Sequence, residues 1–508
     1  MNTYSIIKRT AEKTPQKLFI SIEEENLTCS QFVYETNTLS KALLATGVCQ
    51  GQRVGIILPN SALWYNLFWS IVKIGALPVP LDPQIGQWEM ERLLSITGVE
   101  ICFVASRYRA NAILDQVLEV KKKLPDLTLI LCDTLKDIPG VMSLESFKSM
   151  ADKLGFQDDF VFEPSDNDRL MLACTSGSTG NPKIISVPHI GFYQSQLDMG
   201  KYLQFGAEDI MLLGMPLYHQ GGFGIGLQMM LMGGAVMYQS LFDPIKFLQL
   251  IEQKRVTAIQ LTATLAKILL SVPGFDSYDL SSLRLAYFAG EALPMDIARE
   301  FFEKRGIRLV NVIGSSETTT MVVWDSYYDR NTDVNDFRPL PFTRLKVLDD
   351  QLSPVAVGEI GTIFIHTDGL ITDYYKNENE TSMKIVTIDE VRWFNTGDLG
   401  KMLDNGRVSF VGRSKRIIKR GSNLIYPEEI ESFLLTHPNI EAIAITSEKH
   451  ELIGEMVVAH VQPRQGVHIT RGDIVNFCKG KLAAYKVPDQ VIETSAIPHD
   501  IGKIQYKY

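Results

Sequence analysis

The sequence has no pair of cysteines at the C-x-x-C spacing, and its six cysteines are scattered along 508 residues. This excludes a typical zinc site or disulfide framework and indicates reduced thiols in a cytoplasmic protein. Long apolar runs are also missing. Even one of the longest, residues 225–237, is too short to span a bilayer and contains glycines. The opening residues, MNTYSIIKRTAEKTPQK, lack the apolar core of a signal peptide. We therefore expect neither membrane insertion nor export.

An excess of positive charge is absent as well. The formal net charge is −9 and the sequence pI is about 5.5. Without a basic field to attract a polyanion, nucleic acid is not an expected partner. The composition, 45% hydrophobic and 21% charged, is typical of a folded enzyme, and the length predicts two or three subdomains.

Three common site motifs are missing. No G-x-x-x-x-G-K-[ST] loop is present, since Lys183 follows Asn181 and Pro182 and precedes Ile184. No G-x-G-x-x-G fingerprint follows a strand, and no serine of the glycine-rich stretch is flanked as in G-x-S-x-G. These absences disfavour a mononucleotide kinase, a dinucleotide-binding fold and a serine hydrolase.

The pattern of elements predicts an α/β fold. From about residue 50, short β-branched runs alternate with helical stretches, and the alternation repeats after residue 186. From about residue 340 the pattern becomes rich in strands and turns. We expect an N-terminal domain, residues 1–412, of two α/β subdomains plus a small β subdomain, followed by a mobile α+β lobe, residues 413–508.

The stretch CTSGSTGNPKIIS, residues 174–186, is rich in hydroxyl residues and glycine. Glycines allow backbone N–H groups to approach phosphate oxygens closely, hydroxyls add donors, and a lysine adds positive charge. A polyphosphate is therefore the expected guest. The residues that supply these groups are Thr175, Ser176, Gly177, Ser178, Thr179, Gly180 and Lys183.

Eight stretches in register resemble the core motifs of the adenylate-forming superfamily, which includes acyl- and aryl-CoA ligases, peptide-synthetase adenylation domains and beetle luciferases. They are LTCSQFV (27–33), VKIGALPVPLDP (72–83), TSGSTGNPK (175–183) with PLYHQGG (216–222), IGSSETT (313–319), FNTGDLG (394–400), GRSKRIIKRGSNLIYPEEIE (412–431) and IGKIQ (501–505). The resemblance covers essentially the whole chain.

The resemblance implies a reaction in two steps. A carboxylate attacks the α-phosphorus of ATP and expels pyrophosphate, and a thiol then takes the acyl group from the adenylate. ATP, Mg²⁺ and CoA, or the phosphopantetheine of a carrier protein, are the implied cofactors, with a small carboxylic acid as substrate. Such chemistry requires neutralisation of phosphate charge.

The resemblance also assigns roles to single residues. Glu317 is similar to the magnesium-associated glutamate, and Ser316 keeps the hydroxyl of a phosphate-contacting threonine. Asp398 would accept from the ribose hydroxyls, assisted by Arg413. Lys503 would bridge the carboxylate and the α-phosphate in the first step, and Lys183 would neutralise phosphate charge. By the same resemblance Lys415 is the hinge of the lobe, and Gly290, Glu291 and Ala292 border the nucleotide.

The fourth motif indicates the kind of acid. Peptide-synthetase domains usually carry an aspartate after its aromatic residue to pair with the α-ammonium of the substrate, but here His219 follows Tyr218. A buried ammonium would then lack a partner, which disfavours an α-amino acid. By the resemblance, His219 corresponds to the histidine that closes the carboxylate side of the site in CoA ligases. The segment FCKGKLAAYKVP, residues 477–488, is also similar to a segment common in acyl- and aryl-CoA ligases. The apolar surroundings favour an aromatic or medium-chain aliphatic acid.

Some positions depart from the family pattern. Ile313 replaces the aromatic residue that stacks on adenine, which weakens the expected contact. In the segment that lines the thiol tunnel with Lys419, Gly421 lies one residue early and Ser422 takes the glycine position. The final motif is one residue short before Lys503, and Tyr506 replaces the usual arginine.

Three hypotheses remain open at this point. The first is an acyl- or aryl-CoA ligase, and the second is an AMP-ligase that loads a separate carrier protein. The third is a non-catalytic adenylate-binding protein, which the joint presence of Lys183, Glu317, Asp398 and Lys503 disfavours. An oxygenating luciferase-like activity has no cue in the sequence.

Overall fold

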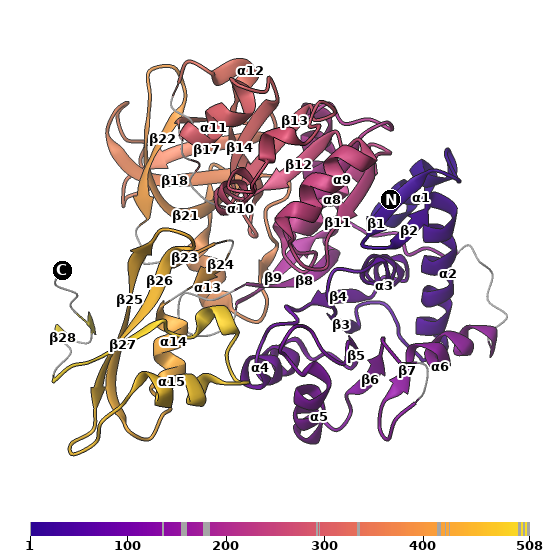
Figure 1. Ribbon diagram of the computed structural model, residues 1–508, viewed down its shortest axis with the longest axis horizontal. Helices are drawn as coiled ribbons and strands as arrows, with labels where there is room; N and C mark the ends of the chain where they lie inside the picture. Colours follow the sequence, from indigo (N-terminus) through magenta and orange to yellow (C-terminus); the bar gives the residue numbers. More distant parts are fainter. Residues whose placement is uncertain are drawn as a thin grey trace.

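A computed structural model shows a large α/β body with a smaller lobe at its side (Figure 1). The structure describes residues 2–134, 137–153, 160–175, 183–290, 293, 295–332, 336–413, 418–421, 423–425, 427–495, 499–500 and 503–504.

The first α/β subdomain contains a five-stranded parallel sheet of order β4-β3-β5-β6-β7. Helices cross over between its strands, as the alternating pattern predicts. Local signals set the helix ends: Ser61 caps the helix that follows β3, and Gly98 ends the next helix in the left-handed conformation. The elements are β3 (Arg53–Ile57), α3 (Ala62–Lys73), β4 (Leu77–Pro80), α4 (Gln87–Thr97), β5 (Ile101–Val104), α5 (Ile113–Lys123), β6 (Thr128–Leu131), β7 (Met142–Ser143) and α6 (Leu144–Ser149).

The second α/β subdomain forms the parallel part of a 14-stranded sheet. Its strands are β10 (Ile210–Leu213), β11 (Ala235–Tyr238), β12 (Ala258–Leu261), β13 (Leu285–Ala289) and β14 (Arg308–Ser315), and its helices are α8 (Gln220–Leu231), α9 (Pro244–Lys254), α10 (Ala263–Leu270) and α11 (Met295–Phe302). The N-terminal segment completes one edge, because β1 pairs with β11 in parallel. That segment contains α1 (Thr3–Glu12), β1 (Leu18–Ile22), β2 (Glu25–Thr28) and α2 (Cys29–Ala45).

The strand-rich region after residue 340 is present, but its strands extend the same sheet. The link is the antiparallel pairing of β15 with β16, followed by β16 with β22. The elements are β15 (Thr319–Asp325), α12 (Ser326–Asp329), β16 (Asp336–Pro339), β17 (Thr343–Leu348), β18 (Ile360–Thr367), β20 (Ile385–Ile388), β21 (Val391–Met402) and β22 (Val408–Arg413).

A small sheet joins the two halves of the body. It has the order β19-β9-β8, so a strand from the later part of the chain pairs with the hairpin that borders the glycine-rich stretch. The elements here are β8 (Arg169–Thr175), β9 (Lys183–Pro188), α7 (His189–Tyr202), β19 (Asp373–Tyr374) and α13 (Glu378–Lys384).

The C-terminal lobe is α+β, as predicted, and has its own apolar core. Its elements are β23 (Ile418–Arg420), β24 (Asn423–Ile425), α14 (Pro427–Leu434), β25 (Ile440–His450), β26 (Gly454–Pro463), α15 (Arg471–Cys478), β27 (Gln490–Glu493), β28 (His499–Asp500) and β29 (Lys503–Ile504). The division into residues 1–412 and 413–508 stays a prediction, because it falls beside the undescribed residues 414–417.

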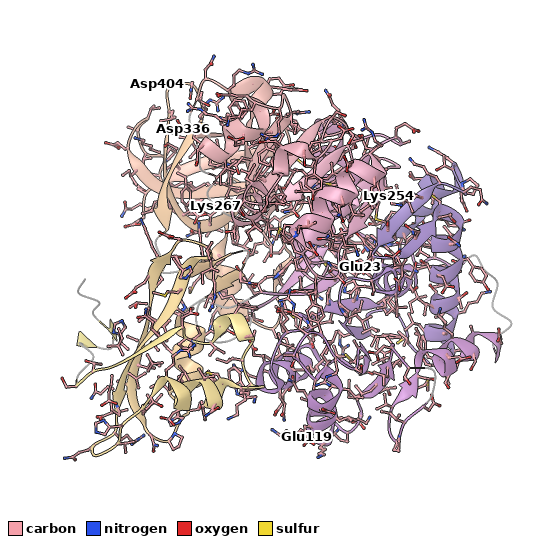
Figure 2. All side chains as sticks on the ribbon, viewed as in Figure 1. Glu23, Glu119, Lys254, Lys267, Asp336 and Asp404 are labelled. Atoms are coloured by element: carbon pink, nitrogen blue, oxygen red, sulfur yellow. The ribbon has the colours of Figure 1, made fainter. Side chains whose placement is uncertain are left out.

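No helix in the described ranges is long and apolar enough to cross a membrane. Many charged side chains are exposed, and Glu119 and Asp404 lie at the outline of the body in Figure 2. Desolvating these ions would be costly, which explains their place on the surface.

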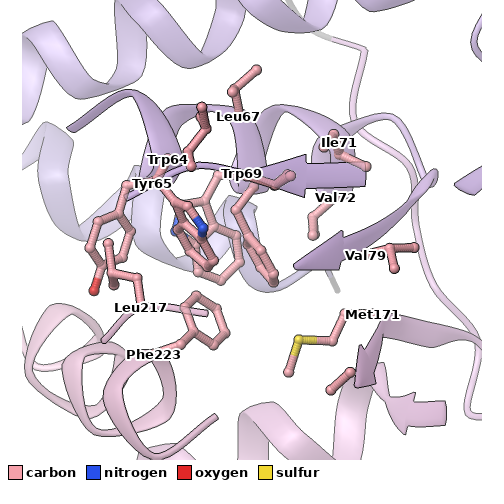
Figure 3. Packing of buried hydrophobic residues seen from close by; sticks show 14 of the residues in the cluster. Trp64, Tyr65, Leu67, Trp69, Ile71, Val72, Val79, Met171, Leu217 and Phe223 are labelled. Carbon is pink, nitrogen blue, oxygen red and sulfur yellow. The ribbon is translucent and has the colours of Figure 1, made fainter. Parts of the chain in front are cut away.

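Helix α8 is held by an aromatic cluster. Phe223 of α8 is 1% exposed and packs against Trp64, Phe68 and Trp69 of α3, with a centroid distance of 4.3 Å to Phe68 (Figure 3). On its other side its ring is stacked with Phe192 of α7 at 6.2 Å. Because rings of this size bury large apolar areas, this packing fixes α8 between α3 and α7.

Replacing Phe223 with alanine should destabilise the large domain by about 3–5 kcal/mol, because the lost ring leaves a cavity among aromatic neighbours. Chemical denaturation followed by tryptophan fluorescence would measure the loss. Ile245→Ala, at a residue that is 49% exposed on α9, is the control and should change stability by less than about 0.5 kcal/mol. Equal effects of the two substitutions would contradict the anchoring role of Phe223.

Candidate active site

A cavity of about 370 Å³ lies between the large body and the C-terminal lobe. Strand ends and loops of the body supply most of its wall, while the lobe contributes residues from β24, α14 and the short helix η3 (Ala484–Lys486). The predicted site residues that line it are Thr175, Lys183, His219, Gly290, Ser316, Glu317 and Asp398. Residues that the sequence places far apart therefore share one space.

The hairpin of β8 and β9 brings the ends of the glycine-rich stretch to the cavity. Thr175 pairs with Lys183 across the two strands, and the Thr175 hydroxyl donates to the Lys183 carbonyl at 3.4 Å. The residues between them, including the predicted Ser176, Gly177, Ser178, Thr179 and Gly180, lie outside the described residues.

Lys183 is held in place by α13 and β19. Its ammonium forms an ion pair with Glu380, and it lies 5.4 Å from the centroid of the Tyr374 ring. Glu380 is 8% exposed, so the pair is largely removed from water. Sequence reasoning missed both partners, because some 200 residues separate them from Lys183.

Glu317 lies in the turn between β14 and β15, next to Ser316. Its Oε1 accepts a hydrogen bond from the Tyr374 hydroxyl at 2.9 Å, and its backbone carbonyl accepts from the Ile371 amide at 2.9 Å. Tyr374 therefore touches both the Lys183 and the Glu317 side chains. This contact orders a cation and a carboxylate along one wall.

Asp398 is 5% exposed and lines the cavity from β21. The preceding Gly397 has φ +73°, which only glycine adopts without strain, and the Asp398 amide donates to the Thr396 hydroxyl at 3.0 Å. Arg413 is the backbone partner of Asp398 across β21 and β22. The Arg413 side chain is not among those described.

His219 occupies the N-cap position of α8 beside the Tyr218 ring, with centroids 4.8 Å apart. Burial lowers its pKa to about 4. At neutral pH the imidazole is therefore uncharged. It can donate one hydrogen bond and accept another from a ligand without placing a cation in the cavity.

Other predicted residues fall at different places. Gly290 lines the cavity with φ +90°. Ile313 packs against the apolar cluster of the second subdomain, beside Phe337 and Phe410, and does not belong to the lining of the main cavity. Glu291, Ala292, Lys415 and Ser422 lie outside the described residues.

The β23–β24 hairpin approaches the large body at α10. Gly421 forms the turn with φ +58°, and a Cβ there would lie 4.0 Å from Thr264 Cγ2. Lys419 precedes it, with its amide donating to Glu455 Oε2 at 2.6 Å, and Asn423 after it lines the cavity. By contrast β28, the partner of the strand that contains Lys503, lies at the outer margin of the lobe (Figure 1).

The lobe is docked on α4 by a buried ion cluster. Lys486 Nζ lies 2.6 Å from Glu89 of α4 and 2.6 Å from Glu429 of α14, and all three side chains are at most 5% exposed. Burial raises the pKa of Glu429 to about 7, although Lys486 opposes the shift. Glu89 also accepts from the Ala483 amide at 2.9 Å.

Apolar packing supports the same interface. Trp88 of α4 packs on Phe433 of α14, with centroids 5.2 Å apart. The Arg92 guanidinium lies over the Trp88 ring, 4.5 Å from its centroid. At Gly86 a Cβ would collide with the Lys481 backbone, so only glycine permits this approach. The sequence stretch LAAYKVP thus contributes Lys486 to the junction between the domains.

Together these features define a two-domain α/β protein built around one shared cavity. The model of the AMP-binding enzymes matches residues 7–375, and the model of the AMP-binding enzyme C-terminal domain matches residues 429–501. The chain belongs to the AMP-binding enzyme family.

Curated relatives match nearly the whole chain. The human mitochondrial medium-chain acyl-CoA ligase ACSF2 is 27% identical over 98% of this chain and 85% of its own length. The indoleacetate–CoA ligase of Aromatoleum aromaticum is 28% identical over 98% of this chain and 96% of its own.

A solved structure shares the fold. The o-succinylbenzoate CoA synthetase MenE of Bacillus subtilis superimposes with a TM-score of 0.85 at 20% identity, covering 99% of this chain and 97% of that one. This confirms the fold class that the sequence predicts, with a large N-terminal domain and a C-terminal lobe.

Replacing Lys486 with methionine should release the lobe, because two carboxylates would stay buried without their cation at a cost of about 3–5 kcal/mol. Small-angle X-ray scattering should then show a larger radius of gyration. Lys479→Met, at an exposed lysine of the same lobe, is the control and should leave the scattering unchanged. A Lys486→Met protein as compact as the parent would contradict this role.

Proposed function

We propose that the protein is an AMP-forming acid–thiol ligase that activates a carboxylic acid with ATP and transfers the acyl group to CoA. The observation that carries the proposal is the shared cavity, in which Lys183, Glu317 and Asp398 of the body face Asn423 and Lys486 of the lobe. The two curated relatives named above are both CoA ligases, of medium-chain acids and of indoleacetate. They favour CoA over a carrier protein as acceptor.

In the first step a carboxylate oxygen of the acid forms a bond to the α-phosphorus, and the bond to pyrophosphate breaks. Lys183 neutralises phosphate charge at the glycine-rich hairpin, and Asp398 accepts from the ribose hydroxyls. Mg²⁺ fits this wall, because it binds through one or two carboxylates and the phosphates, and Glu317 supplies such a carboxylate. When bound, the ion would supply positive charge that offsets the charge on the phosphates.

In the second step the CoA sulfur bonds to the acyl carbon and the bond from that carbon to the phosphate oxygen breaks. AMP leaves with this oxygen, and the proton of the thiol passes to solvent. The docked lobe suits this step, since the β23–β24 hairpin meets the cavity while the strand of Lys503 is paired at the far margin. For the first step the lobe would turn and bring Lys503 to the α-phosphate. Lys415 would be the hinge of this turn.

Neutral His219 agrees with an acid that has no α-ammonium. A buried ammonium requires a carboxylate partner, and an uncharged imidazole is no substitute for one. Aromatic and medium-chain aliphatic acids are the proposed substrates.

The function is tested by pyrophosphate release over a panel of carboxylic acids, with ATP and Mg²⁺, in the presence and absence of CoA. We expect pyrophosphate with an aromatic or medium-chain acid, and AMP release that depends on CoA. If pyrophosphate is never released with any acid, the proposal is wrong. Acylation of a carrier protein but never of CoA would overturn the choice of acceptor.

Lys503→Ala should slow adenylation by roughly 10²-fold or more, because the attacking carboxylate and the α-phosphate would lose their shared cation. Thioester formation from pre-formed acyl-adenylate should stay nearly unchanged. Single-turnover assays of each half-reaction separate the two effects. Lys507→Ala, four residues further along the tail, is the matched control and should affect neither step; equal losses in both half-reactions for Lys503→Ala would refute the two-position arrangement.

A further inference from the structure

Two glutamines face each other across the gap between α7 and α8. Gln228 Nε2 donates to Gln196 Oε1 at 2.9 Å, and the side chains are 1% and 4% exposed. Both residues line the main cavity. A buried amide pair at this position is unexpected for a pocket that receives a plain hydrocarbon.

The pair is incompletely satisfied by the protein. Gln228 Oε1 is buried and has no hydrogen-bond partner among the described residues. Leaving such an acceptor unpaired costs about 1–3 kcal/mol. The nearby Gln220, in the first turn of α8, adds an amide whose Oε1 and Nε2 also lack partners within the described part of the chain. The cavity thus holds polar groups that a ligand would satisfy.

The hydrogen-bonding character of the pair does not depend on which way the amides are turned. As they stand, one amide N–H₂ and one carbonyl are left over after the mutual hydrogen bond. Rotating both amides by half a turn exchanges the residues that supply them, but again leaves one donor and one acceptor. A group that both donates and accepts matches this pair, and a hydroxyl is the smallest such group.

Helix α8 also leaves a path to the pair. Gly221, Gly224, Ile225 and Gln228 follow helical spacing and line the cavity on one face. From Gly221 to Gln228 the helix rises about 10 Å. The two glycines lack side chains, and a Cβ on Gly224 would already touch Gln196 and Phe192 at 3.4 Å. A ligand that begins near His219 therefore reaches Gln228 only if it is several carbons long.

Helices α7 and α8 offer no counter-ion to an ionised group at this end. In the described structure, the residues of α7 and α8 that line the cavity are all uncharged: Phe192, Gln196, Gln220, Gly221, Gly224, Ile225 and Gln228. A second carboxylate or an ammonium buried against these helices would find no counter-ion on them, which disfavours an ionised group by several kcal/mol. A neutral polar group is the better fit.

We infer that the acid which this enzyme activates carries a hydroxyl group at the end remote from its carboxylate, and that the Gln196–Gln228 pair recognises it. This inference rests on the proposed function. It assigns a specificity role to two residues that no motif of the sequence points to.

Matched acids that differ only in the hydroxyl test the inference. We would compare para-hydroxyphenylpropanoate with phenylpropanoate, and omega-hydroxyoctanoate with octanoate, by kcat/KM for pyrophosphate release. In at least one pair the hydroxylated acid should be favoured by about 10- to 100-fold, because its absence leaves the glutamines unpaired. Equal or better use of the plain acid in both pairs would overturn the inference.

Gln228→Leu should abolish the preference and improve the use of the plain acid, since leucine is apolar and of similar size. Gln196→Leu is the second variant and should act in the same direction. Gln194→Leu is the matched control, because Gln194 lies on α7 like Gln196 but does not line the cavity, and it donates to Asp198 at 2.8 Å. The preference for the hydroxylated acid should persist in this variant. Equal loss of both acids in the two cavity variants, with unchanged folding, would contradict recognition of the hydroxyl.

Calorimetric binding of the same acids separates this inference from the proposed function. If the hydroxylated acids bind more tightly and Gln228→Leu removes the difference, recognition holds even when no pyrophosphate is formed, and only the proposed function fails. If plain acids are activated at least as well as hydroxylated ones, the function stands and the inference is wrong.

Discussion

A lysine enclosed by two carboxylates connects the two parts of this protein. Lys486 and Glu429 belong to the small lobe, and Glu89 belongs to the body, so the cluster forms only when the lobe docks. Burying three ions carries a desolvation penalty that offsets much of their attraction. An interface of this kind is specific in geometry but weak in net stability, which would suit the turn of the lobe proposed above.

The balance between the desolvation penalty and the attraction of the ions also bears on the residues that surround the cluster. Trp88 and Phe433 add an apolar contact, and Gly86 allows the backbones to meet closely. A broad apolar interface would hold the lobe more permanently, because separating it would expose hydrocarbon to water. When the ion cluster opens, each charged group regains water instead. The junction of this AMP-binding enzyme thus combines a buried ion cluster with an apolar contact between Trp88 and Phe433.

The sequence predicted the course of the chain well, because alternating apolar strands and amphipathic helices depend on local periodicity. It also predicted which loops meet: Lys183, Glu317 and Asp398 all line one cavity. Contacts between segments far apart in the sequence leave no periodic pattern from which they could be predicted. Glu380 beside Lys183 is one example, since nothing in the local pattern of α13 marks it as the partner of a residue in β9.

Nothing in the sequence indicated that Ile313 packs into the apolar cluster of the second subdomain. The direction of its side chain depends on the twist of β14 against the neighbouring strands. Gln196 and Gln228 illustrate the same limit from the other side. In a helical stretch each reads as an ordinary polar residue, and only the packing of α7 on α8 brings their amides together away from water.

The cavity is divided in its electrostatics, and this division links the chemistry to the choice of substrate. Charged residues, among them Lys183, Glu317 and Asp398, come from the β8–β9 hairpin, the β14–β15 turn and β21, while α7 and α8 contribute glycines, apolar groups and neutral amides. In the proposed reaction the charge changes of adenylation would fall at the first wall, where oriented ions would stabilise them. Along the helices a substrate meets a low-polarity environment in which a single satisfied hydrogen bond discriminates strongly, because the alternative is a buried polar group without a partner.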